Sequence, residues 1–340
     1  MNSFRRILLP LLLFALCLSL SGGIAEAEET EGTLFVYDLP AGITEPCDRA
    51  GSVTEEHYAT WRYDLEGNRL SPAIGTLYVY TPYGYDPEKQ YDILYLMHGG
   101  GETAAYWFGL DVYAPGGPRY EPQHAGAAVN LLDQRIAAGE CPEMIVVTPS
   151  YVNQFEEDHY WFAPGTDAWL ETFAYEFRND ILPFVEAKYA TYAGGFPIGE
   201  KLIASRAHRA FAGFSMGSFT AFQAIWMHCL PYVGCIGNFS GCDLQETGIA
   251  RRVCELLQRE GGTWPVYYWY NGSGTRDSLH DEHLAAYRMI LSACPDLFTE
   301  GDDPAAGQNA CFVDKPGKLH NFENWIVDLY NITGVFFRAG

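Results

Sequence analysis

The stretch His208-Arg-Ala-Phe-Ala-Gly-Phe-Ser-Met-Gly-Ser-Phe-Thr-Ala-Phe-Gln-Ala-Ile-Trp226 joins a strand-like segment to a helix-like one. Residues 209–214 are apolar and aromatic enough to form a short buried strand, and residues 216–226 predict a helix. Between them stands Gly213-Phe-Ser-Met-Gly217. Gly-x-Ser-x-Gly at a sharp turn from strand to helix is the arrangement that lifts a serine hydroxyl clear of a sheet. We therefore predict Ser215 as a catalytic nucleophile.

The flanking glycines and the following helix explain why this spacing suits a nucleophile. A serine in such a tight turn holds a strained backbone, and Gly213 and Gly217 carry no side chain that would meet the turn itself. The hydroxyl then stands above a helix N-terminus, whose partial positive charge favours a developing oxyanion. The alternative is a chance Gly-x-Ser-x-Gly in a loop, so the rest of the chain must supply the partner groups.

Segments on both sides of this motif alternate between strand and helix patterns. We expect strands at residues 76–81, 91–97, 144–148, 209–214, 233–238, 266–270 and 311–313, and helices at 127–138, 170–189, 216–226, 247–259, 281–292 and 321–330. This alternation predicts the α/β class, with a mostly parallel central sheet and helices on both faces. Residues 71–340 would then be one catalytic domain, preceded by a polar, irregular lead-in segment at residues 28–70.

Residues 1–27 have the pattern of a secretory signal peptide. Arg5-Arg6 precedes an apolar run over residues 7–20, and Ala25-Glu-Ala27 has the form of a small-residue cleavage site. The run is short and contains Pro10, which disfavours a membrane anchor. We therefore expect cleavage after Ala27 and a secreted, extracellular protein with no stable membrane association.

Composition restricts the partners and the cofactors. The formal net charge of −22 disfavours nucleic acid, because its phosphates would be repelled. Nine cysteines occur, and removing Cys17 with the signal peptide leaves an even number, which suggests disulfides in an exported chain. We predict that Cys294 and Cys311 pair across the acidic loop between them. No two cysteines have the spacing Cys-x-x-Cys, so a zinc site is not expected.

A glycine run follows the wholly apolar segment at residues 91–97. His98-Gly-Gly-Gly101 stands at the expected carboxyl end of a central strand, where bare backbone lets N–H groups approach a substrate oxygen. We predict that the N–H groups of Gly100 and Met216 form an oxyanion hole with two donors. The alternative is an ordinary glycine-rich turn between a strand and a helix.

The acid of a serine hydrolase should follow the nucleophile in this kind of chain, and the histidine should follow the acid. Asp277 ends the glycine-bearing loop after the strand at residues 266–270, so it is our predicted acid. Asp281 and Asp243 are the rival carboxylates. We prefer Asp277 because it follows the strand directly, whereas Asp281 should open the next helix as a cap.

The general base must be one of the histidines beyond Asp277. His280 and His283 lie near the start of a helix, where we expect solvated side chains. His320 lies in a loop after the last strand and before the last helix, so its imidazole can reach over the strand-to-helix turn at residues 213–217, which we call the elbow. We predict His320 as the general base.

Together these motifs resemble those of the feruloyl esterases and their esterase-D-like relatives, a family of α/β-hydrolases that act on plant cell-wall esters. The similarity rests on Leu96-Met-His-Gly-Gly-Gly101, Gly213-Phe-Ser-Met-Gly217, Gly274-Thr-Arg-Asp277 and His320-Asn-Phe-Glu-Asn-Trp325, in the family's order over about residues 71 to 335. It implies the α/β-hydrolase fold and a triad of Ser215, Asp277 and His320. It also implies acyl transfer through an acyl-enzyme, without a metal or an organic cofactor. Ser218 departs mildly from relatives, which often have a second glycine there.

The motifs leave the substrate open. Trp107, Trp161 and Trp325 lie in or beside expected substrate-side loops, and we predict that they offer stacking surfaces to a phenolic acyl group or a sugar. Core packing is the alternative for such aromatic residues. The leading hypothesis is a feruloyl (cinnamoyl) esterase that releases hydroxycinnamic acids from a small-molecule or polysaccharide-linked ester. The alternatives are an acetyl xylan esterase, an acyltransferase of the mycolyltransferase type and a non-catalytic carbohydrate-binding protein.

Overall fold

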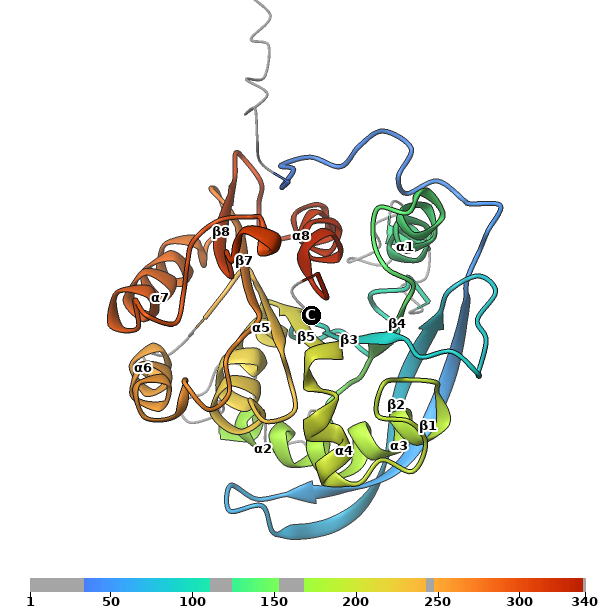
Figure 1. The fold of residues 1–340 in the computed structure, drawn as a ribbon, viewed down its shortest axis with the longest axis horizontal. Helices are drawn as coiled ribbons and strands as arrows, with labels where there is room; N and C mark the ends of the chain where they lie inside the picture. The colour runs from blue at the N-terminus through green and yellow to red at the C-terminus, as the bar shows by residue number, and fades with distance from the viewer. Residues whose placement is uncertain (1–33, 111–123, 153–167, 243–247, 339–340) are drawn as a thin grey trace, which may run out of the picture. The chain divides into compact units, whose positions relative to one another are not determined.

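The computed structural model describes residues 34–110, 124–152, 168–242 and 248–338, which are built around an eight-stranded sheet (Figure 1). Its strands are β1 (Ser52–Tyr63), β2 (Arg69–Thr81), β3 (Asp92–Met97), β4 (Met144–Thr148), β5 (Arg209–Phe214), β6 (Cys235–Phe239), β7 (Tyr268–Gly274) and β8 (Ala310–Lys315). Their order across the sheet is β1-β2-β4-β3-β5-β6-β7-β8. The β1–β2 and β2–β4 pairs are antiparallel, whereas the other neighbours are parallel. The predicted α/β fold with a mostly parallel sheet is confirmed.

Helices cover both faces of this sheet (Figure 1). The α-helices are α1 (Ala127–Ala138), α2 (Ala168–Glu176), α3 (Leu182–Lys188), α4 (Gly199–Ala204), α5 (Met216–Thr220), α6 (Ile249–Glu260), α7 (His280–Ala293) and α8 (Phe322–Val335). The packing of α1 and α8 buries one face, and α2, α3, α6 and α7 cover the other. None of the helices in the described ranges combines the length and the apolar character needed to cross a bilayer.

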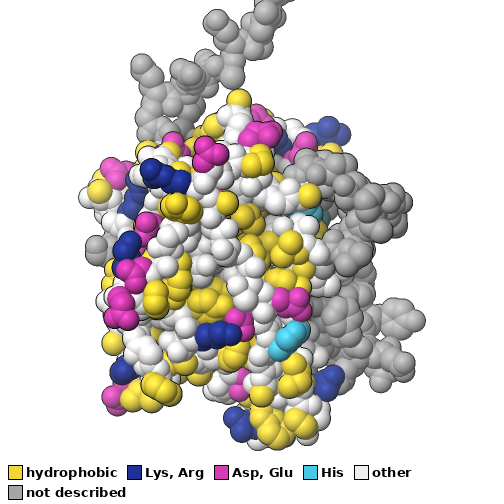
Figure 2. All heavy atoms as spheres, turned by 90° about the vertical axis from the view of Figure 1, so that its right-hand side faces the viewer, with side chains coloured by type: hydrophobic (Ala, Val, Ile, Leu, Met, Phe, Trp, Pro, Cys, Tyr) yellow, Lys and Arg dark blue, Asp and Glu magenta, His cyan; other side chains and the backbone are white. Residues whose placement is uncertain are grey.

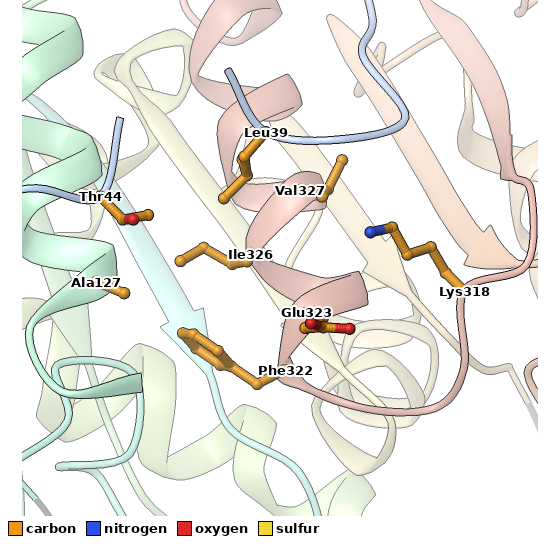
Figure 3. A pocket seen from close by; sticks show the side chains of 8 residues that line it. All are labelled: Leu39, Thr44, Ala127, Lys318, Phe322, Glu323, Ile326 and Val327. Carbon is orange, nitrogen blue, oxygen red and sulfur yellow. The ribbon is translucent and has the colours of Figure 1, made fainter. Parts of the chain in front are cut away.

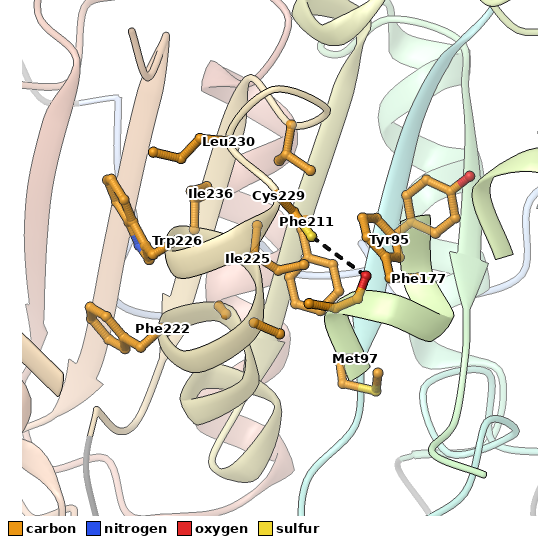
Figure 4. Close-up of a cluster of buried hydrophobic side chains, with 14 of the residues drawn as sticks. Tyr95, Met97, Phe177, Phe211, Phe222, Ile225, Trp226, Cys229, Leu230 and Ile236 are labelled. Atoms are coloured by element: carbon orange, nitrogen blue, oxygen red, sulfur yellow. Dashed lines mark hydrogen bonds between the residues drawn. The ribbon is translucent and has the colours of Figure 1, made fainter. Parts of the chain in front are cut away.

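Strand β3 shows how one short run of sequence serves both faces. Successive side chains of a strand point to opposite sides of a sheet. Tyr95 and Met97 accordingly join the hydrophobic cluster under α2 and the elbow helix, whereas Leu94 and Leu96 join the cluster under α1 and α8. Figure 4 shows Tyr95 and Met97 among the aromatic side chains of the first cluster. A strand buried on both faces therefore reads as one continuous apolar run.

The prediction of an irregular lead-in at residues 28–70 is wrong for its second half, where β1 forms an edge strand. Residues Ser52–Tyr63 pair with β2 along their whole length. The buried side chains of β1 are Glu56, Tyr58, Thr60 and Tyr63, while most of its other side chains are exposed. An edge strand of this kind reads as polar sequence because solvent covers its second face.

Two predicted helices contain a π-helical segment. The helix expected at 170–189 becomes α2, a π segment at Phe177–Ile181 and then α3. Pro183 lies in the first turn of α3 and has no N–H to donate, so the regular ladder cannot pass through it. The N–H of Leu182 instead donates to the carbonyl oxygen of Phe177, five residues earlier. The elbow helix is likewise α5 followed by a π segment at Ala221–Trp226.

The predicted disulfide between Cys294 and Cys311 is not formed, and both residues are free thiols. Cys294 packs in the hydrophobic cluster on one face of the sheet, and Cys311 packs in the cluster on the opposite face. The sheet therefore separates the two sulfur atoms. Burial raises the pKa of the Cys311 thiol to about 12, so it stays protonated at neutral pH.

A buried ion pair joins the end of β8 to α8. Lys315 Nζ donates to Asp328 Oδ1, and neither side chain has any exposed surface. The hydroxyl of Tyr270 donates to the same carboxylate oxygen at 2.8 Å. The pair therefore fixes the strand from which the chain turns toward His320.

We expect Lys315→Met to lower the free energy of unfolding by about 3–5 kcal/mol, because Asp328 would keep a buried charge without its partner. Urea denaturation followed by circular dichroism measures this change. The double variant Lys315→Met/Asp328→Asn removes both charges and should recover most of the loss. Equal stability of Lys315→Met and the wild type would contradict this interpretation.

Candidate active site

Ser215 occupies the turn between β5 and α5 with a backbone that non-glycine residues rarely adopt. Its φ is 52° and its ψ is −118°. A Cβ at Gly213 would lie 2.7 Å from the carbonyl carbon of Gly217, and a Cβ at Gly217 would lie 2.7 Å from the carbonyl oxygen of His98. Both flanking positions therefore require glycine. The turn is also held from the side, since the Ser215 N–H donates to the carbonyl oxygen of Phe239 at 2.9 Å.

We expect Gly213→Ala to destabilise the protein by about 1–3 kcal/mol, because the added methyl group meets backbone atoms that cannot move aside. Thermal unfolding measures the loss. Gly262→Ala is the matched control, because nothing lies within 4 Å of a Cβ at that position. A Gly213→Ala protein as stable as the Gly262→Ala protein would show that the turn can widen.

The structure brings Ser215, His320 and Asp277 into one line of hydrogen bonds. Nε2 of His320 lies 3.0 Å from Oγ of Ser215. Its Nδ1 lies 2.9 Å and 3.0 Å from the two carboxylate oxygens of Asp277. The carboxylate can only accept, so Nδ1 carries the proton and Nε2 is free to accept the serine proton. This is the arrangement that nucleophilic catalysis by serine requires.

Backbone hydrogen bonds explain why an aspartate after β7 and a histidine after β8 meet. The N–H of Thr275 donates to the carbonyl oxygen of Lys315 at 3.0 Å, and the N–H of Arg276 donates to that of Lys318 at 3.1 Å. The loop carrying Asp277 is thereby tied to the turn that precedes His320. His320 itself stands two residues before α8 (Phe322–Val335), which Asn321 caps.

The Asp277 side chain is fully buried, yet it is held in the charged form. Burial acts to raise the pKa of its carboxyl group, but the hydrogen bond and charge of His320, the N–H of Leu279 and the hydroxyl of Ser240 outweigh it. The pKa therefore lies below the ordinary value for aspartate. An ionised carboxylate at this place can stabilise an imidazolium cation on His320.

The rival residues lie elsewhere. Asp281 is fully exposed and bonds to His280, which in turn bonds to Asp314. His283 is not solvated as predicted but fully buried, where it accepts from the N–H of Gly241 and contacts Asn271. Burial lowers its pKa to about 3, so it is neutral. Asp243 lies outside the described residues.

Of the two predicted oxyanion donors, Met216 lies beside the nucleophile, and Gly100 lies in a turn that packs against the elbow. Met216 opens α5 directly after Ser215, and Gly100 lies in the turn after β3. This turn abuts the elbow, because Gly217 packs against the backbone carbonyls of Met97 and His98. Nδ1 of His98 donates to the carbonyl oxygen of Gly99 at 2.8 Å, and its Nε2 accepts from the Ser150 hydroxyl at 2.9 Å. Burial lowers the pKa of His98 to about 4, so its imidazole is neutral at neutral pH.

The prediction that Trp107 stacks on substrate is wrong. The side chain is fully buried, its Nε1 donates to the carbonyl oxygen of Met97 at 3.0 Å, and its ring packs edge-on against Phe214. Trp325 also lies in the interior, with 6% of its surface exposed. It stacks on Phe214 at 3.8 Å and meets the His320 ring edge-on at 5.1 Å, so it supports the imidazole. Trp161 lies outside the described residues.

Sequence reasoning missed two polar residues beside the acid, Ser240 and Asn324. Both are fully buried, and Nδ2 of Asn324 donates to Oγ of Ser240 at 3.0 Å. The only local signals are the Ser240-Gly241 pair at the end of a strand and the asparagine one turn after His320. Neither signal points to the acid without the three-dimensional structure.

Two of the pockets in the described part of the chain lie near the edge of the sheet where the parallel strands have their carboxyl ends. One of about 220 Å³ lies between residues 39–44 and the first turns of α1 and α8, with Phe322 and Ile326 as apolar walls and Lys318 beside it (Figure 3). The other, of about 430 Å³, lies between β2 and the turns that follow β3 and β4. Carboxyl ends of parallel strands meet at one edge of a sheet, so this second pocket opens on the same edge as Ser215.

The described residues show no cluster of three or more histidine, cysteine or acidic side chains that could hold a metal ion. Figure 2 views the right-hand side of Figure 1, where acidic, basic and hydrophobic side chains are interspersed on the coloured surface. No basic patch gathers on that coloured part of the face.

The model of the Esterase family matches residues 74–241, which contain the glycine run and the elbow. A solved structure of a protein named FAE is 30% identical, with a TM-score of 0.70 over 90% of this chain and 95% of that chain. The chain belongs to this esterase family. It is a carboxylic ester hydrolase of the feruloyl esterase type, as the resemblance of its motifs implied.

Two further comparisons concern a second solved structure and a curated relative. A mutant of the feruloyl esterase module from Clostridium thermocellum, complexed with sinapinate, has a TM-score of 0.71 at 28% identity, over 90% of this chain and 95% of that chain. Endo-1,4-beta-xylanase Y of Acetivibrio thermocellus is 32% identical over 298 residues, or 85% of this chain. The esterase chain spans only 23% of that relative's length.

Proposed function

We propose that this esterase is a secreted feruloyl (cinnamoyl) esterase that releases hydroxycinnamic acids from plant cell-wall polysaccharide through an acyl-enzyme. The observation that carries the proposal is the unbroken line of hydrogen bonds from Ser215 through His320 to Asp277. A relative of similar size that was complexed with sinapinate supports the hydroxycinnamate as the acyl group.

In the proposed first step, Oγ of Ser215 attacks the ester carbonyl carbon while its proton moves to Nε2 of His320. The carbonyl oxygen becomes an oxyanion facing the N–H groups of Met216 and Gly100. The oxyanion then collapses, the bond to the alcohol oxygen breaks, and His320 returns its proton to the departing alcohol. The products of this step are the free alcohol and an acyl-enzyme on Ser215.

In the second step, water replaces the alcohol. Nε2 of His320 accepts a proton from the water as its oxygen attacks the acyl carbon, and the tetrahedral oxyanion again faces the two N–H groups. Collapse breaks the bond to Ser215, which recovers its proton from His320. The carboxylate of Asp277 stays ionised throughout and stabilises the imidazolium in both steps.

The substrate class is tested with methyl ferulate and an aryl acetate, each assayed with the wild type and with Ser215→Ala as the blank. We expect the wild type to cleave methyl ferulate with the higher kcat/KM, and the variant to cleave neither ester. Cleavage of the acetate alone would favour an acetyl esterase instead. Acyl transfer to a sugar in preference to water would favour a transferase, and no cleavage of either ester would favour a binding protein.

Export is a separate part of the proposal, supported by the basic, apolar and Ala-x-Ala pattern of residues 1–27. Expression in a secreting host followed by N-terminal sequencing of the protein in the medium tests it. The expected N-terminus is Glu28. Retention of the whole chain inside the cells, with residues 1–27 still attached, would contradict it.

A further inference from the structure

Ser240 shares an unusual backbone with the nucleophile. Among the described residues, four that are not glycine have a positive φ, and two of these are Ser215 at 52° and Ser240 at 53°. Each directly follows the last residue of one of two neighbouring parallel strands, β5 and β6. Backbone of this kind persists only where the surroundings hold it, and it gathers at functional sites. Ser240 is therefore a candidate for a role in the site.

Hydrogen bonds of Ser240 and of Phe239, the residue directly before it, reach all three loops that carry Ser215, Asp277 and His320. The carbonyl oxygen of Phe239, directly before it, accepts from the N–H of Ser215 at 2.9 Å. The N–H of Ser240 donates to the carbonyl oxygen of Gly272 in β7 at 2.9 Å, and the loop after β7 carries Asp277. Its hydroxyl accepts from Asn324, which stands one turn of α8 beyond His320.

The direction of the hydrogen bonds around the hydroxyl is fixed by chemistry. Nδ2 of Asn324 lies 3.0 Å from Oγ of Ser240 and, in a longer contact, 3.5 Å from Oδ2 of Asp277. An amide nitrogen only donates and a carboxylate only accepts. The Ser240 oxygen therefore accepts from Asn324 and has its own proton left for the carboxylate. A hydrogen bond from Ser240 is among the interactions that lower the pKa of Asp277.

We propose that Ser240 and Asn324 are positioning residues that orient the Asp277 carboxylate toward Nδ1 of His320. This inference rests on the proposed function, because it assumes that Asp277 serves as the acid of the triad. Neither residue reaches the reacting atoms, so both act through Asp277. Their removal should slow the chemical step and change its pH dependence without altering the substrate pocket.

Other charged groups also face this carboxylate and must be considered in a pH profile. They are His320 in the loop before α8, His283 on α7, Lys315 on β8 and Asp328 on α8. His283 is neutral because burial lowers its pKa to about 3, and Lys315 and Asp328 bind each other. His280 bonds to Asp281 and Asp314, away from the carboxylate. None of these pairings involves the Ser240 hydroxyl.

The test is the rate at which an organophosphonate labels Ser215, measured from pH 4 to 9, because this rate reports on the triad whichever ester is natural. We expect Ser240→Ala to lower the second-order rate constant about ten- to a hundredfold, the loss of one hydrogen bond to a charged group. We also expect the acid limb of the profile to move to higher pH. The sign follows because loss of a donor raises the pKa of Asp277, so the carboxylate is protonated earlier as pH falls.

Ser273→Ala is the matched control, since Ser273 is equally buried and its hydroxyl has no hydrogen-bond partner among the described residues. It should leave the rate and the profile unchanged. Ser240→Gly separates the hydroxyl from the backbone, because glycine adopts a positive φ without strain. It should be at least as stable as Ser240→Ala yet equally slow. Asn324→Ala should act in the same direction, and the double variant should lose less than the sum of the two single losses.

Two results would overturn the proposal while the proposed function stands. One is wild-type labelling in folded Ser240→Ala, and the other is full recovery of rate and profile in Ser240→Gly. Absence of labelling in the wild type would instead remove Ser215 as nucleophile, and the proposed function and the positioning role of Ser240 and Asn324 would fall together.

Discussion

Ser215→Ala is expected to lower kcat about a million-fold, leaving only the contribution of the oxyanion donors and of substrate binding. The reason lies in the geometry, because Oγ of Ser215 is the one hydroxyl that lies 3.0 Å from Nε2 of His320 in the described site. Without it, His320 has no nucleophile to activate except water, which nothing holds in the same place. The measurement is single-turnover hydrolysis of methyl ferulate.

The fold should survive this change, so the loss can be assigned to chemistry. Alanine has the same Cβ as serine and meets the same strain at a φ of 52°. The flanking Gly213 and Gly217 keep their contacts, and the N–H of residue 215 can still donate to Phe239. Thermal unfolding of the variant should therefore occur near the wild-type temperature.

Ser273→Ala serves here too as the control for a buried hydroxyl, and it should retain wild-type kcat. A Ser215→Ala protein that kept more than about a thousandth of wild-type kcat would point to another nucleophile. Loss of phosphonate labelling together with retained hydrolysis would lead to the same conclusion.

The hydrogen-bonded arrangement of Ser215, His320 and Asp277 could be predicted from the sequence because each member stands in a local signal. Ser215 lies in a pentapeptide at a strand-to-helix turn, Asp277 in a loop directly after a strand, and His320 in the loop before a capped helix. Short-range patterns of this kind fix where a strand ends. The parallel sheet then brings these carboxyl ends to one edge, so the three residues meet without further information.

Features that depend on contacts distant in sequence could not be predicted in this way. Trp107 belongs to an aromatic triplet that suits a binding loop, but its environment is set by the Met97 carbonyl and the Phe214 ring. Cys294 and Cys311 are close in sequence, yet the sheet stands between their side chains. In both cases the decisive fact is which face of the sheet a residue occupies, and local composition does not contain it.

The second large effect is expected for Asp277→Asn, which should lower kcat about ten thousand-fold while KM changes little. Oδ1 of Asp277 accepts from the N–H of Leu279 at 2.9 Å, and Oδ2 faces Nδ2 of Asn324. The Leu279 N–H should hold the oxygen of the new amide at its own side, which turns the amide nitrogen toward Nδ1 of His320. That nitrogen donates, so Nδ1 must accept and the proton moves to Nε2.

A proton on Nε2 cannot be reconciled with general-base catalysis, because Nε2 then has no lone pair for the Ser215 proton. The loss should therefore persist at every pH where the imidazole is neutral. Asp281→Asn is the matched control, since that carboxylate is fully exposed and bonds only to His280 in the described contacts. It should retain wild-type kcat. Equal losses in the two variants would assign the effect to net charge and would remove Asp277 from the triad.

The same substitution should also change how stability depends on pH. The Asp277 carboxyl has a lowered pKa in the folded protein, so it contributes stability above its unfolded pKa of about 3.9 and loses it as pH falls through the lower folded value. Asparagine has no such dependence. Unfolding temperatures of the wild type and Asp277→Asn should therefore converge as pH falls below about 4. A constant difference over this range would mean that the carboxylate is not held ionised by His320 and its other donors, and the proposed role of Asp277 would then lose its electrostatic basis.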